Sequence, residues 1–470
     1  MNPKALYIAG EFIHTDEYLS VKNPYSNEEI AQVSVAHEKD LFAAIEAAQT
    51  IRSTYQKWTG LQVSHALLKI ADRMNDFSEE FTQTIISESA KPYRYAKGEV
   101  LRAVETFRMA AFASTKLPHE LIALDTAASG AGLMGRVQYA SSGIVAGISP
   151  FNFPLNLVAH KVAPAIATRS PIILKPSSKT PLTALLLAKI IHECGLPDGA
   201  FSVLPCSRKV GDILVEDSRV QVLSFTGSPE VGWSMKERSG KKKVVLELGG
   251  NAAAIVHQDA ELKAAIEQCF IGALAYSGQV CIHTQRIYVH RNLYASFLEE
   301  FVTKASSLRC QDPALHSCEF SVMIDESNAT RVESWIEEAQ NAGANLLFGG
   351  KRNGNFVEPT IFSKTSRGMK IHDEEVFGPV VCINPYDHID EAIEQVNDSR
   401  FGLQAAIFSN SQKIIEQCYA QLEVGAVIAN KATTFRTDQM PYGGVKDSGF
   451  GREGVEYAMM DYLEPKLLVF

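Results

Sequence analysis

From about residue 137 onward, short runs of β-branched residues alternate with segments of helical periodicity, and this alternation restricts the fold more than any other feature. Helical patterns such as 182–194 and 229–238 separate the runs. Strands that alternate with helices predict a parallel sheet covered by helices, in which ligands bind beyond the carboxyl ends of the strands. The first runs are 143–148, 171–174, 201–204, 220–225 and 243–248.

A second alternation follows between residue 251 and about residue 430, and it predicts a second α/β domain. Residues 38 to about 115 show helical spacing instead. The tail 462–470 is apolar and strand-like. Because no neighbouring segment offers this tail a partner, we expect it to complete the sheet of another subunit. The strands expected in the second domain are 286–289, 380–383, 405–408 and 426–428.

Length and charge narrow the possible functions. A chain of 470 residues exceeds what one hydrophobic core organises, so about two or three domains are expected. Acidic residues outnumber basic ones, 54 to 45, and the net charge of -9 argues against nucleic acid or an anionic membrane as the main partner. No stretch approaches the roughly 20 apolar residues that span a bilayer, and the N-terminus lacks a signal-peptide pattern. We therefore expect a soluble, cytoplasmic protein.

Two patterns that often mark metals and cofactors give no site here. The 8 cysteines are scattered without the spacing of zinc or redox motifs, so no metal is expected. Gly130, Gly132 and Gly135 satisfy the G-x-G-x-x-G dinucleotide fingerprint, which should close a strand and open a helix. They lead into an extended segment instead, and no acidic residue follows about 20 positions later. We interpret these glycines as a turn.

Two side chains are candidates for covalent and acid–base chemistry. Cys281 follows Gly278, and a glycine turn exposes what comes after it, although most cysteines in such a chain are small buried hydrophobes. Glu247 ends an apolar strand between two leucines and precedes two glycines. If it is buried, its pKa rises and it suits the role of a general base; the alternative is a glutamate that faces solvent.

Two strand-to-helix junctions carry groups that suit anions. Asn152 lies between the run 143–148 and a helix opened by Pro154, where its amide can donate to an oxyanion or simply cap the helix. The segment 225–228 ends another strand and begins the next helix. Free N–H groups at that helix start can bind phosphate, and an ordinary turn explains the segment equally well. Taken singly, both interpretations stay open at each junction.

Together these segments resemble the aldehyde dehydrogenase superfamily over essentially the full length of the chain and in the family's order. One such match carries little weight, whereas the whole series is specific. The resembling segments are 151–154 (Phe-Asn-Phe-Pro), 175–178 (Lys-Pro-Ser-Ser), 225–228 (Phe-Thr-Gly-Ser), 247–250 (Glu-Leu-Gly-Gly), 278–281 (Gly-Gln-Val-Cys), 375–379 (Glu-Val-Phe-Gly-Pro) and 441–449 (Pro-Tyr-Gly-Gly-Val-Lys-Asp-Ser-Gly).

The resemblance implies a thiol mechanism that uses NAD or NADP. Cys281 would form a thiohemiacetal whose oxyanion Asn152 holds, hydride transfer would leave a thioester, and Glu247 would activate the water that releases the acid. Lys175 would bind the adenosine ribose, Ser228 the pyrophosphate, and Glu375 with Phe377 the nicotinamide ribose. The complete set of implied cofactor contacts is Ile148, Pro150, Phe151, Lys175, Ser178, Phe225, Gly227, Ser228, Leu248, Glu375 and Phe377.

The family's architecture implies an α/β fold class with three parts. A Rossmann-variant cofactor domain would comprise 1–118 and 137–246, and an α/β catalytic domain would comprise 247–440. A small β-stranded oligomerisation element would comprise 119–136 and 450–470. The implied partners are a small-molecule aldehyde and further copies of the chain, in a homodimer or a homotetramer.

Cofactor preference depends on the third residue after Lys175. Family members restricted to NAD often carry a glutamate there, which binds the ribose hydroxyls and repels a 2′-phosphate. This chain has Ser178, a neutral donor beside a cation. The resemblance therefore predicts that NADP is accepted along with NAD.

The family's pattern also places Arg102, His160, Arg436 and Tyr442 along the aldehyde tunnel, beside the oxyanion-binding asparagine. Clustered arginines repel one another unless an anion joins them, so the pattern predicts a short aldehyde of about two to four carbons with an anionic tail. Relatives of this kind oxidise glyceraldehyde-3-phosphate, phosphonoacetaldehyde, sulfolactaldehyde or succinate semialdehyde. Several phosphate users carry arginine where this chain has Val280, which favours a singly charged sulfonate or carboxylate, or lactaldehyde itself.

Three alternatives stay open. A CoA-acylating relative would pass the acyl group to CoA, but such relatives tend to lack the Glu247 equivalent. A non-catalytic structural homologue would require loss of the nucleophile or the base, and both are present. An enzyme for uncharged aldehydes would fit if the tunnel arginines are ordinary surface residues and the histidine is satisfied by its neighbours.

Overall fold

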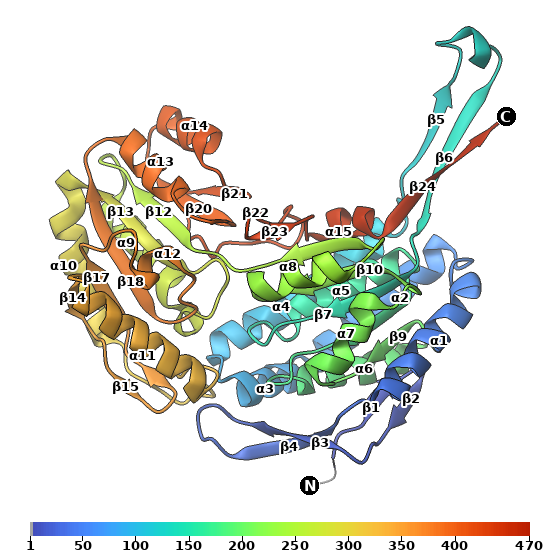
Figure 1. Ribbon diagram of the computed structural model, residues 1–470, viewed down its shortest axis with the longest axis horizontal. Helices are drawn as coiled ribbons and strands as arrows, with labels where there is room; N and C mark the ends of the chain where they lie inside the picture. The colour runs from blue at the N-terminus through green and yellow to red at the C-terminus, as the bar shows by residue number, and fades with distance from the viewer. Residues whose placement is uncertain (1–2) are drawn as a thin grey trace.

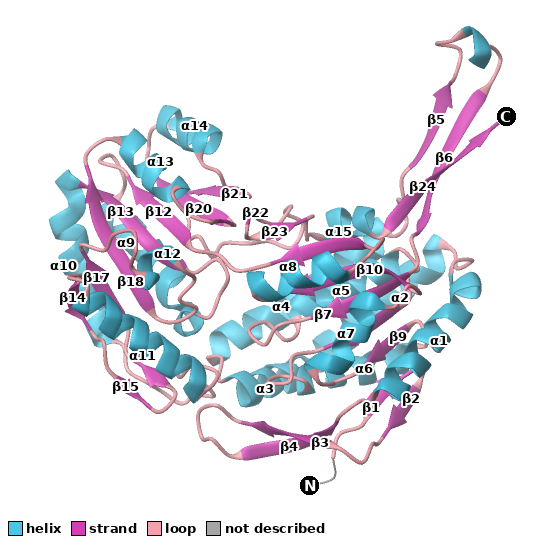
Figure 2. Ribbon diagram, viewed as in Figure 1, coloured by secondary structure: helices cyan, strands magenta, loops and turns pink. Residues whose placement is uncertain are grey.

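The computed structural model describes residues 3–470 as two helix-covered sheets and a thin sheet that projects from them (Figure 1, Figure 2). The first sheet has 8 strands in the order β2-β1-β9-β8-β7-β10-β11-β23. Its five central strands are parallel, whereas the edge strands β1, β2 and β23 run antiparallel. The strands are β1 (Leu6–Ile8), β2 (Glu11–Ile13), β7 (Ile144–Ile148), β8 (Ile172–Lys175), β9 (Phe201–Val203), β10 (Val220–Thr226), β11 (Lys243–Glu247) and β23 (Gly449–Phe450).

The central strands of this sheet are nearly continuous buried apolar runs, as parallel strands covered on both faces should be. The chain leaves β7 toward β8 on one side and returns as β10 on the other. Such a reversal of strand order opens a crevice at the carboxyl ends of the strands. The covering helices are α1 (Glu38–Tyr55), α2 (Gly60–Asp76), α3 (Ser78–Ser89), α4 (Tyr93–Ala113), α5 (Asn156–Ala167), α6 (Leu182–Cys194), α7 (Arg208–Glu216) and α8 (Pro229–Arg238).

The second sheet has 7 strands in the order β14-β17-β18-β13-β12-β20-β21, all parallel except β14. Its strands are β12 (Ala252–Val256), β13 (Thr284–His290), β14 (Asn345–Phe348), β17 (Thr360–Ser363), β18 (Val380–Tyr386), β20 (Gln404–Phe408) and β21 (Ala426–Ala429). Its helices are α9 (Leu262–Leu274), α10 (Arg291–Ser307), α11 (Glu326–Asn341), α12 (Lys370–Asp373), α13 (Ile389–Asn397) and α14 (Gln412–Gln421).

The projecting sheet overturns the premise that the C-terminal tail has no partner in its own chain, whereas pairing of the tail with another subunit stays a prediction. The tail forms β24 (Leu463–Val469) after α15 (Val455–Asp461), and it pairs antiparallel with β6 (Met134–Ser141) of the same chain. β6 pairs in turn with β5 (His119–Ala123), a strand that the sequence pattern did not reveal (Figure 1). The tail therefore has a partner within its own chain, and the three strands form an arm.

The glycine fingerprint lies near the tip of this arm. Gly130 ends the short 3-10 helix η1 (Ala128–Gly130), Gly132 has a φ of 79°, and Gly135 is already inside β6. The segment is a turn between β5 and β6, as predicted, and it lies outside the crevice. Smaller two-stranded sheets complete the fold: the hairpins β3 (Tyr18–Lys22) with β4 (Glu29–Ser34) and β15 (Arg352–Asn353) with β16 (Phe356–Val357), and the long-range antiparallel pair β19 (Phe401–Gly402) with β22 (Val445–Lys446).

Within residues 3–470, every helix is too short or too polar to traverse a bilayer. The same residues hold no group of three or more His, Cys, Asp or Glu side chains arranged to bind a metal ion.

Candidate active site

Two cavities meet at Cys281. The first measures about 730 Å³ and lies at the carboxyl ends of β7, β10 and β11; we call it the strand-end cavity. The second measures about 540 Å³ and lies between α4, the start of α5, the end of α9 and the loop 434–442; we call it the tunnel. Cys281 and Leu157 line both cavities. A ligand in either cavity can therefore approach the Cys281 sulfur.

A strained turn holds Cys281 at this junction. Helix α9 ends at Leu274, and Tyr276, Ser277 and Gly278 all have positive φ angles of 48°, 53° and 71°. L-residues rarely adopt this conformation, and its retention near reactive groups is a common form of stored strain. A Cβ atom at Gly278 would lie 2.2 Å from the backbone oxygen of Gly378, so only glycine fits there.

The Cys281 thiol is protonated at neutral pH. Its sulfur lies 2.9 Å from the hydroxyl oxygen of Tyr442. Burial raises the pKa of Cys281 to about 12, although the Tyr442 hydrogen bond and the nearby Arg436 charge act in the opposite direction. Since the thiolate is the nucleophilic form, the site needs a base or an additional positive charge before this sulfur can attack.

Glu247 is the only carboxyl group of the described chain whose two oxygens are both buried without a hydrogen-bond partner. It ends β11 and is 2% exposed. Burial, reinforced by the negative charge of Glu453, raises the pKa of Glu247 well above its ordinary value. The following loop reaches the nucleophile, because a Cβ at Gly250 would lie 2.2 Å from the Cys281 backbone oxygen. An unpartnered buried carboxyl is costly to keep, and its raised pKa suits proton transfer near neutral pH.

Asn152 is not the cap of α5. The first N–H groups of the helix region, on Leu155 and Asn156, donate to the Glu99 carboxylate at 2.9 and 3.1 Å. The Asn152 amide instead donates to the backbone oxygen of Gln279 at 3.0 Å, next to the nucleophile segment. Glu99 therefore satisfies the helix terminus, and the simple capping interpretation of Asn152 is wrong.

The strand-end cavity collects most of the residues predicted to bind a cofactor: Pro150, Phe151, Gly227, Ser228, Leu248, Glu375 and Phe377. The rings of Phe151 and Phe377 meet edge to face with centroids 5.8 Å apart. The Ser228 side chain does not cap α8, which leaves N–H groups at that helix start available for phosphate. Glu375 accepts a hydrogen bond from the Gly250 N–H at 3.0 Å, and burial raises the pKa of Glu375 to about 7. A nicotinamide nucleotide fits this donor set and shape.

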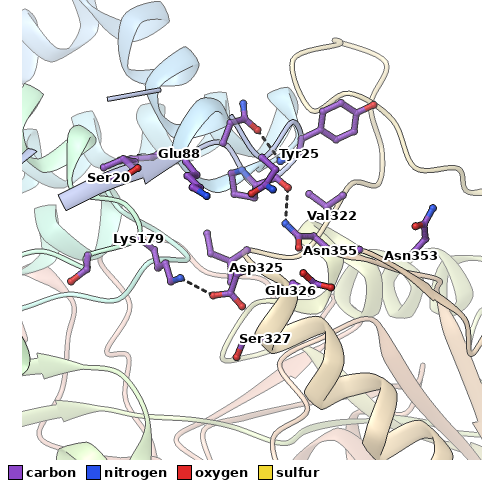
Figure 3. A pocket seen from close by; sticks show the side chains of 18 residues that line it. Ser20, Tyr25, Glu88, Lys179, Val322, Asp325, Glu326, Ser327, Asn353 and Asn355 are labelled. Carbon is purple, nitrogen blue, oxygen red and sulfur yellow. Dashed lines mark hydrogen bonds and ion pairs between the residues drawn. The ribbon is translucent and has the colours of Figure 1, made fainter. Parts of the chain in front are cut away.

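Four other predicted cofactor residues lie outside the strand-end cavity. Ile148 and Phe225 are buried at the ends of their strands, and the Lys175 side chain extends over Gly211 of α7. Ser178 is exposed and lines a separate cavity of about 570 Å³. In that cavity Lys179 forms a 3.0 Å ion pair with Asp325 at the start of α11 (Figure 3).

The tunnel brings together Arg102, Arg436 and Tyr442, as the resemblance implied, but His160 lies behind its wall. Arg102 donates twice to Asp438, at 3.2 and 2.7 Å. The fully buried His160 also contacts Asp438, at 2.8 Å. These groups converge because α4 and α5 pack side by side against the loop 434–442.

Arg436 lies over the Tyr442 ring, with its guanidinium carbon 3.7 Å from the centroid. It also pairs with Glu453 at 3.3 Å, and Glu453 pairs with Lys161 at 3.1 Å. The sequence argument missed Asp438 and Glu453, which supply anions for the clustered cations within the protein itself. No spacing marks these two loop residues. Lys161 had a signal, since it is the one lysine in the mostly apolar helix α5, whose other polar residues are Asn156 and His160.

Known proteins resemble this chain over almost its whole length. The model of the aldehyde dehydrogenase family matches residues 12–468. A 3-sulfolactaldehyde dehydrogenase of Priestia aryabhattai is 39% identical over 466 residues, which cover 99% of this chain and 97% of the relative. The structure of aldehyde dehydrogenase 21 from Physcomitrella patens in complex with the reaction product succinate has a TM-score of 0.98 and 43% identity, covering 100% of this chain and 99% of that one.

A second solved structure carries a cofactor. The glyceraldehyde-3-phosphate dehydrogenase of Methanocaldococcus jannaschii, complexed with NADP, has a TM-score of 0.93 and 35% identity, covering 97% of this chain and 100% of that one. The α/β fold and the family that the motifs indicated are thus confirmed. The chain belongs to the aldehyde dehydrogenase family and is an enzyme that oxidises an aldehyde with a nicotinamide dinucleotide, NAD or NADP.

Proposed function

We propose that this enzyme oxidises a short aldehyde with a singly charged tail, such as a carboxylate or a sulfonate, to the corresponding acid. The observation that carries the proposal is the position of Cys281, which faces the strand-end cavity on one side and a cation-lined tunnel on the other. An aldehyde whose tail contacts Arg102 or Arg436 would extend along the tunnel toward this sulfur. Sulfolactaldehyde, the substrate named for one relative, and succinate, the product bound in the structure of another, have tails of this chemistry.

The proposed chemistry uses three residues in turn. The Cys281 thiolate adds to the aldehyde carbon and forms a thiohemiacetal, whose oxyanion accepts hydrogen bonds from the Asn152 amide and the Cys281 N–H. A nicotinamide held in the strand-end cavity would supply the hydride acceptor, and loss of hydride from the thiohemiacetal would leave a thioester on Cys281. Glu247 then takes a proton from water, and the resulting hydroxide releases the acid and restores the thiol. The unpartnered oxygens of Glu247 favour this hydrolysis.

The cofactor would be held by the walls of the strand-end cavity. Phe151 and Phe377 would flank the nicotinamide riboside, Glu375 would accept from its ribose hydroxyls, and the N-terminus of α8 after Ser228 would bind the pyrophosphate. Lys175 and Ser178 would bind the adenosine ribose, and the neutral Ser178 would permit NADP. The predicted division into a cofactor domain (1–118, 137–246) and a catalytic domain (247–440) belongs to this proposal.

We also propose that the arm formed by β5, β6 and β24 joins copies of the chain in a homodimer or a homotetramer. The arm exposes apolar side chains that a monomer would leave in water. Leu121 and Leu467 are 65% and 55% exposed, and Phe470 at its end is 59% exposed. Sedimentation of the purified protein would test this, with Leu467→Lys expected to shift it toward monomer.

A substrate panel tests the proposed activity. Succinate semialdehyde, glyceraldehyde-3-phosphate and propanal are compared by kcat/KM, with both NAD and NADP. We expect the carboxylate to be preferred, and we expect Arg102→Met to cost about 2 kcal/mol on anionic substrates, with a smaller effect on propanal. Arg108→Met is the matched control, because Arg108 lies on the same helix and pairs outside the tunnel with Glu105 and Asp72.

Two results would overturn the proposal. Cys281→Ala must abolish oxidation while cofactor binding persists, and near-normal turnover in this variant contradicts the mechanism. Equal efficiency on propanal and on the best anionic aldehyde, with no selective effect of Arg102→Met or Arg436→Ala, contradicts the proposed substrate class.

A further inference from the structure

Each cationic side chain that lines the tunnel is paired with a carboxylate. Glu99 is the one of these carboxylates that itself lines the tunnel; Asp438 and Glu453 are buried, whereas Glu319 is exposed at the surface. Apolar side chains form most of the lining, and Arg94 and Arg102 are its exposed cations, since Lys91 and Arg436 are almost fully buried. The pairs are Lys91–Glu99, Arg94–Glu319, Arg102–Asp438 and Arg436–Glu453.

Asp438 accepts hydrogen bonds from three different side chains, as many as Glu453 does. It is 3% exposed and accepts hydrogen bonds from Arg102, from His160 at 2.8 Å and from Asn156 at 3.3 Å. The donors come from α4 and α5, so the loop that carries Asp438 is fastened to both helices. Burial alone would raise the pKa of Asp438, but the His160 hydrogen bond and the Arg102 charge outweigh it and hold that pKa well below its ordinary value.

The contact with Asp438 fixes which part of Arg102 can reach a ligand. Asp438 occupies the Nε and one Nη2 donor of the guanidinium, at 3.2 and 2.7 Å. A guanidinium has five N–H donors in a rigid plane, so the two N–H groups of Nη1 and one of Nη2 remain for other acceptors. Arg102 is 31% exposed in its side chain and lines the tunnel, where this free edge can bind an anion.

The same contact limits the positive charge that an anion meets. The charges of Arg102 and Asp438 cancel, and His160 adds none, because burial and the Arg436 charge lower its pKa despite the contact with Asp438. Lys161 and Arg436 share the single carboxylate Glu453, so these three groups together carry one surplus positive charge.

Building on the proposed function, we propose that Asp438 is a specificity-determining positioning residue. It orients the free edge of Arg102 into the tunnel and cancels the charge of that arginine, so that the tunnel matches a tail with one negative charge rather than two. A phosphate tail would need a second uncompensated cation. Asp438 disfavours a phosphate tail in two ways, because its carboxylate repels the dianion and because it cancels the charge of Arg102.

The test is a charge-neutral replacement, Asp438→Asn, in the full-length enzyme. We expect kcat/KM for glyceraldehyde-3-phosphate relative to succinate semialdehyde to rise by about tenfold or more, because the added net charge favours a dianion most. The change should fall mainly on KM, and propanal should be affected less than either anion. The matched control, Asp72→Asn, removes the carboxylate that faces Arg108 on the outer side of α4 and should leave the ratio where it was. An unchanged ratio in Asp438→Asn overturns the inference.

A second pair of variants keeps the test decisive if Asp438→Asn folds poorly. Arg102→Met leaves Asp438 as an uncompensated carboxylate behind the tunnel wall, so this variant should bind succinate semialdehyde more weakly than the double variant Arg102→Met/Asp438→Asn. Without Arg102, replacing Asp438 should shift the ratio between phosphate and carboxylate substrates by less than it does with Arg102 present, because the guanidinium that Asp438 orients is gone. If Asp438→Asn shifts the ratio equally with and without Arg102, Asp438 does not act through the arginine. If the wild type prefers anionic aldehydes but Asp438→Asn leaves the ratio between phosphate and carboxylate substrates unchanged, only this inference is refuted. If the wild type uses propanal as efficiently as the anionic aldehydes, the proposed substrate class is refuted.

Discussion

The thiol sulfur of Cys281 and the hydroxyl oxygen of Tyr442 lie 2.9 Å apart, although 161 positions separate them in the chain. Tyr442 comes from the loop after β21, and its own hydroxyl stays protonated because burial raises the pKa of Tyr442 well above its ordinary value. A protonated hydroxyl can donate to sulfur. The contact therefore stabilises the thiolate in a site where burial otherwise opposes it.

Replacing this tyrosine should make the thiol less reactive. Burial raises the pKa of Cys281 to about 12 and the Tyr442 hydrogen bond lowers it, so Tyr442→Phe should raise that pKa further. The rate of alkylation by iodoacetamide, which follows the thiolate fraction, should drop at any fixed pH below this pKa. The whole rate–pH line should move to higher pH. Mass spectrometry of the Cys281 peptide over a pH series measures this, and equal rates in both proteins would show that the hydroxyl does not donate to sulfur.

Glu247→Gln should separate acylation from hydrolysis. The thioester can still form, so a burst of reduced cofactor should remain in the first turnover while steady-state turnover falls by about 100-fold or more. Because the pKa of Glu247 is raised, its basic form increases as pH rises, and wild-type turnover should rise with it. The Gln variant should lose this rise. Stopped-flow and steady-state assays give both quantities, and a parallel loss of burst and turnover would place Glu247 earlier, as the base for Cys281.

Ser178→Glu should raise KM for NADP far more than KM for NAD, because a carboxylate would repel the 2′-phosphate. Ser177→Glu, one position earlier, is the matched control and should discriminate less between the cofactors. Steady-state kinetics with both cofactors decide the matter. Ser178 lies outside the strand-end cavity. Equal effects on NAD and NADP would therefore mean that the adenosine half does not reach this loop.

Lys161→Met should destabilise the protein by about 3 kcal/mol, since it leaves Glu453 buried with one cation fewer. Lys179→Met removes a lysine from the exposed pair with Asp325 and should cost almost nothing. Thermal unfolding of the two variants compares them directly. A double variant, Lys161→Met with Glu453→Gln, should recover part of the loss. Similar melting temperatures of the two single variants would mean that the buried ion pair contributes no more to stability than the exposed one.

The local sequence pattern was enough to predict the strands that end at the active site. The predicted ends of β10 and β11 differ from the structure by one residue, because a run of β-branched residues followed by a turn is a strong local signal. The alanine-rich β12 (Ala252–Val256) lacks that signal and was missed. The Cys281 and Glu247 segments were identified because glycines lie beside them. Glycine is needed where two backbone segments come close together, as Gly250 and Cys281 do.

Residues that act through long-range contacts escaped the sequence. Glu99 caps α5 from helix α4, and Asp438 reaches His160 across 278 positions. Neither contact produces a repeating pattern in the sequence, because the identity of a single residue in a loop or on a helix face does not indicate which residues pack against it. The tail gave the opposite error: its strand was recognised, but its partner β6 was not, so a contact within the chain was expected between chains.

The meeting of two cavities at one sulfur has a kinetic consequence. If the nicotinamide binds in the strand-end cavity and the aldehyde in the tunnel, as proposed, the two ligands reach Cys281 by separate routes, and neither has to pass the other on entering or leaving. A slow-leaving coenzyme would not trap the acid, and a long aldehyde would not block exchange of the nucleotide. Any compulsory order of binding in this enzyme must then come from changes in the reactivity of the thiol, and not from obstruction.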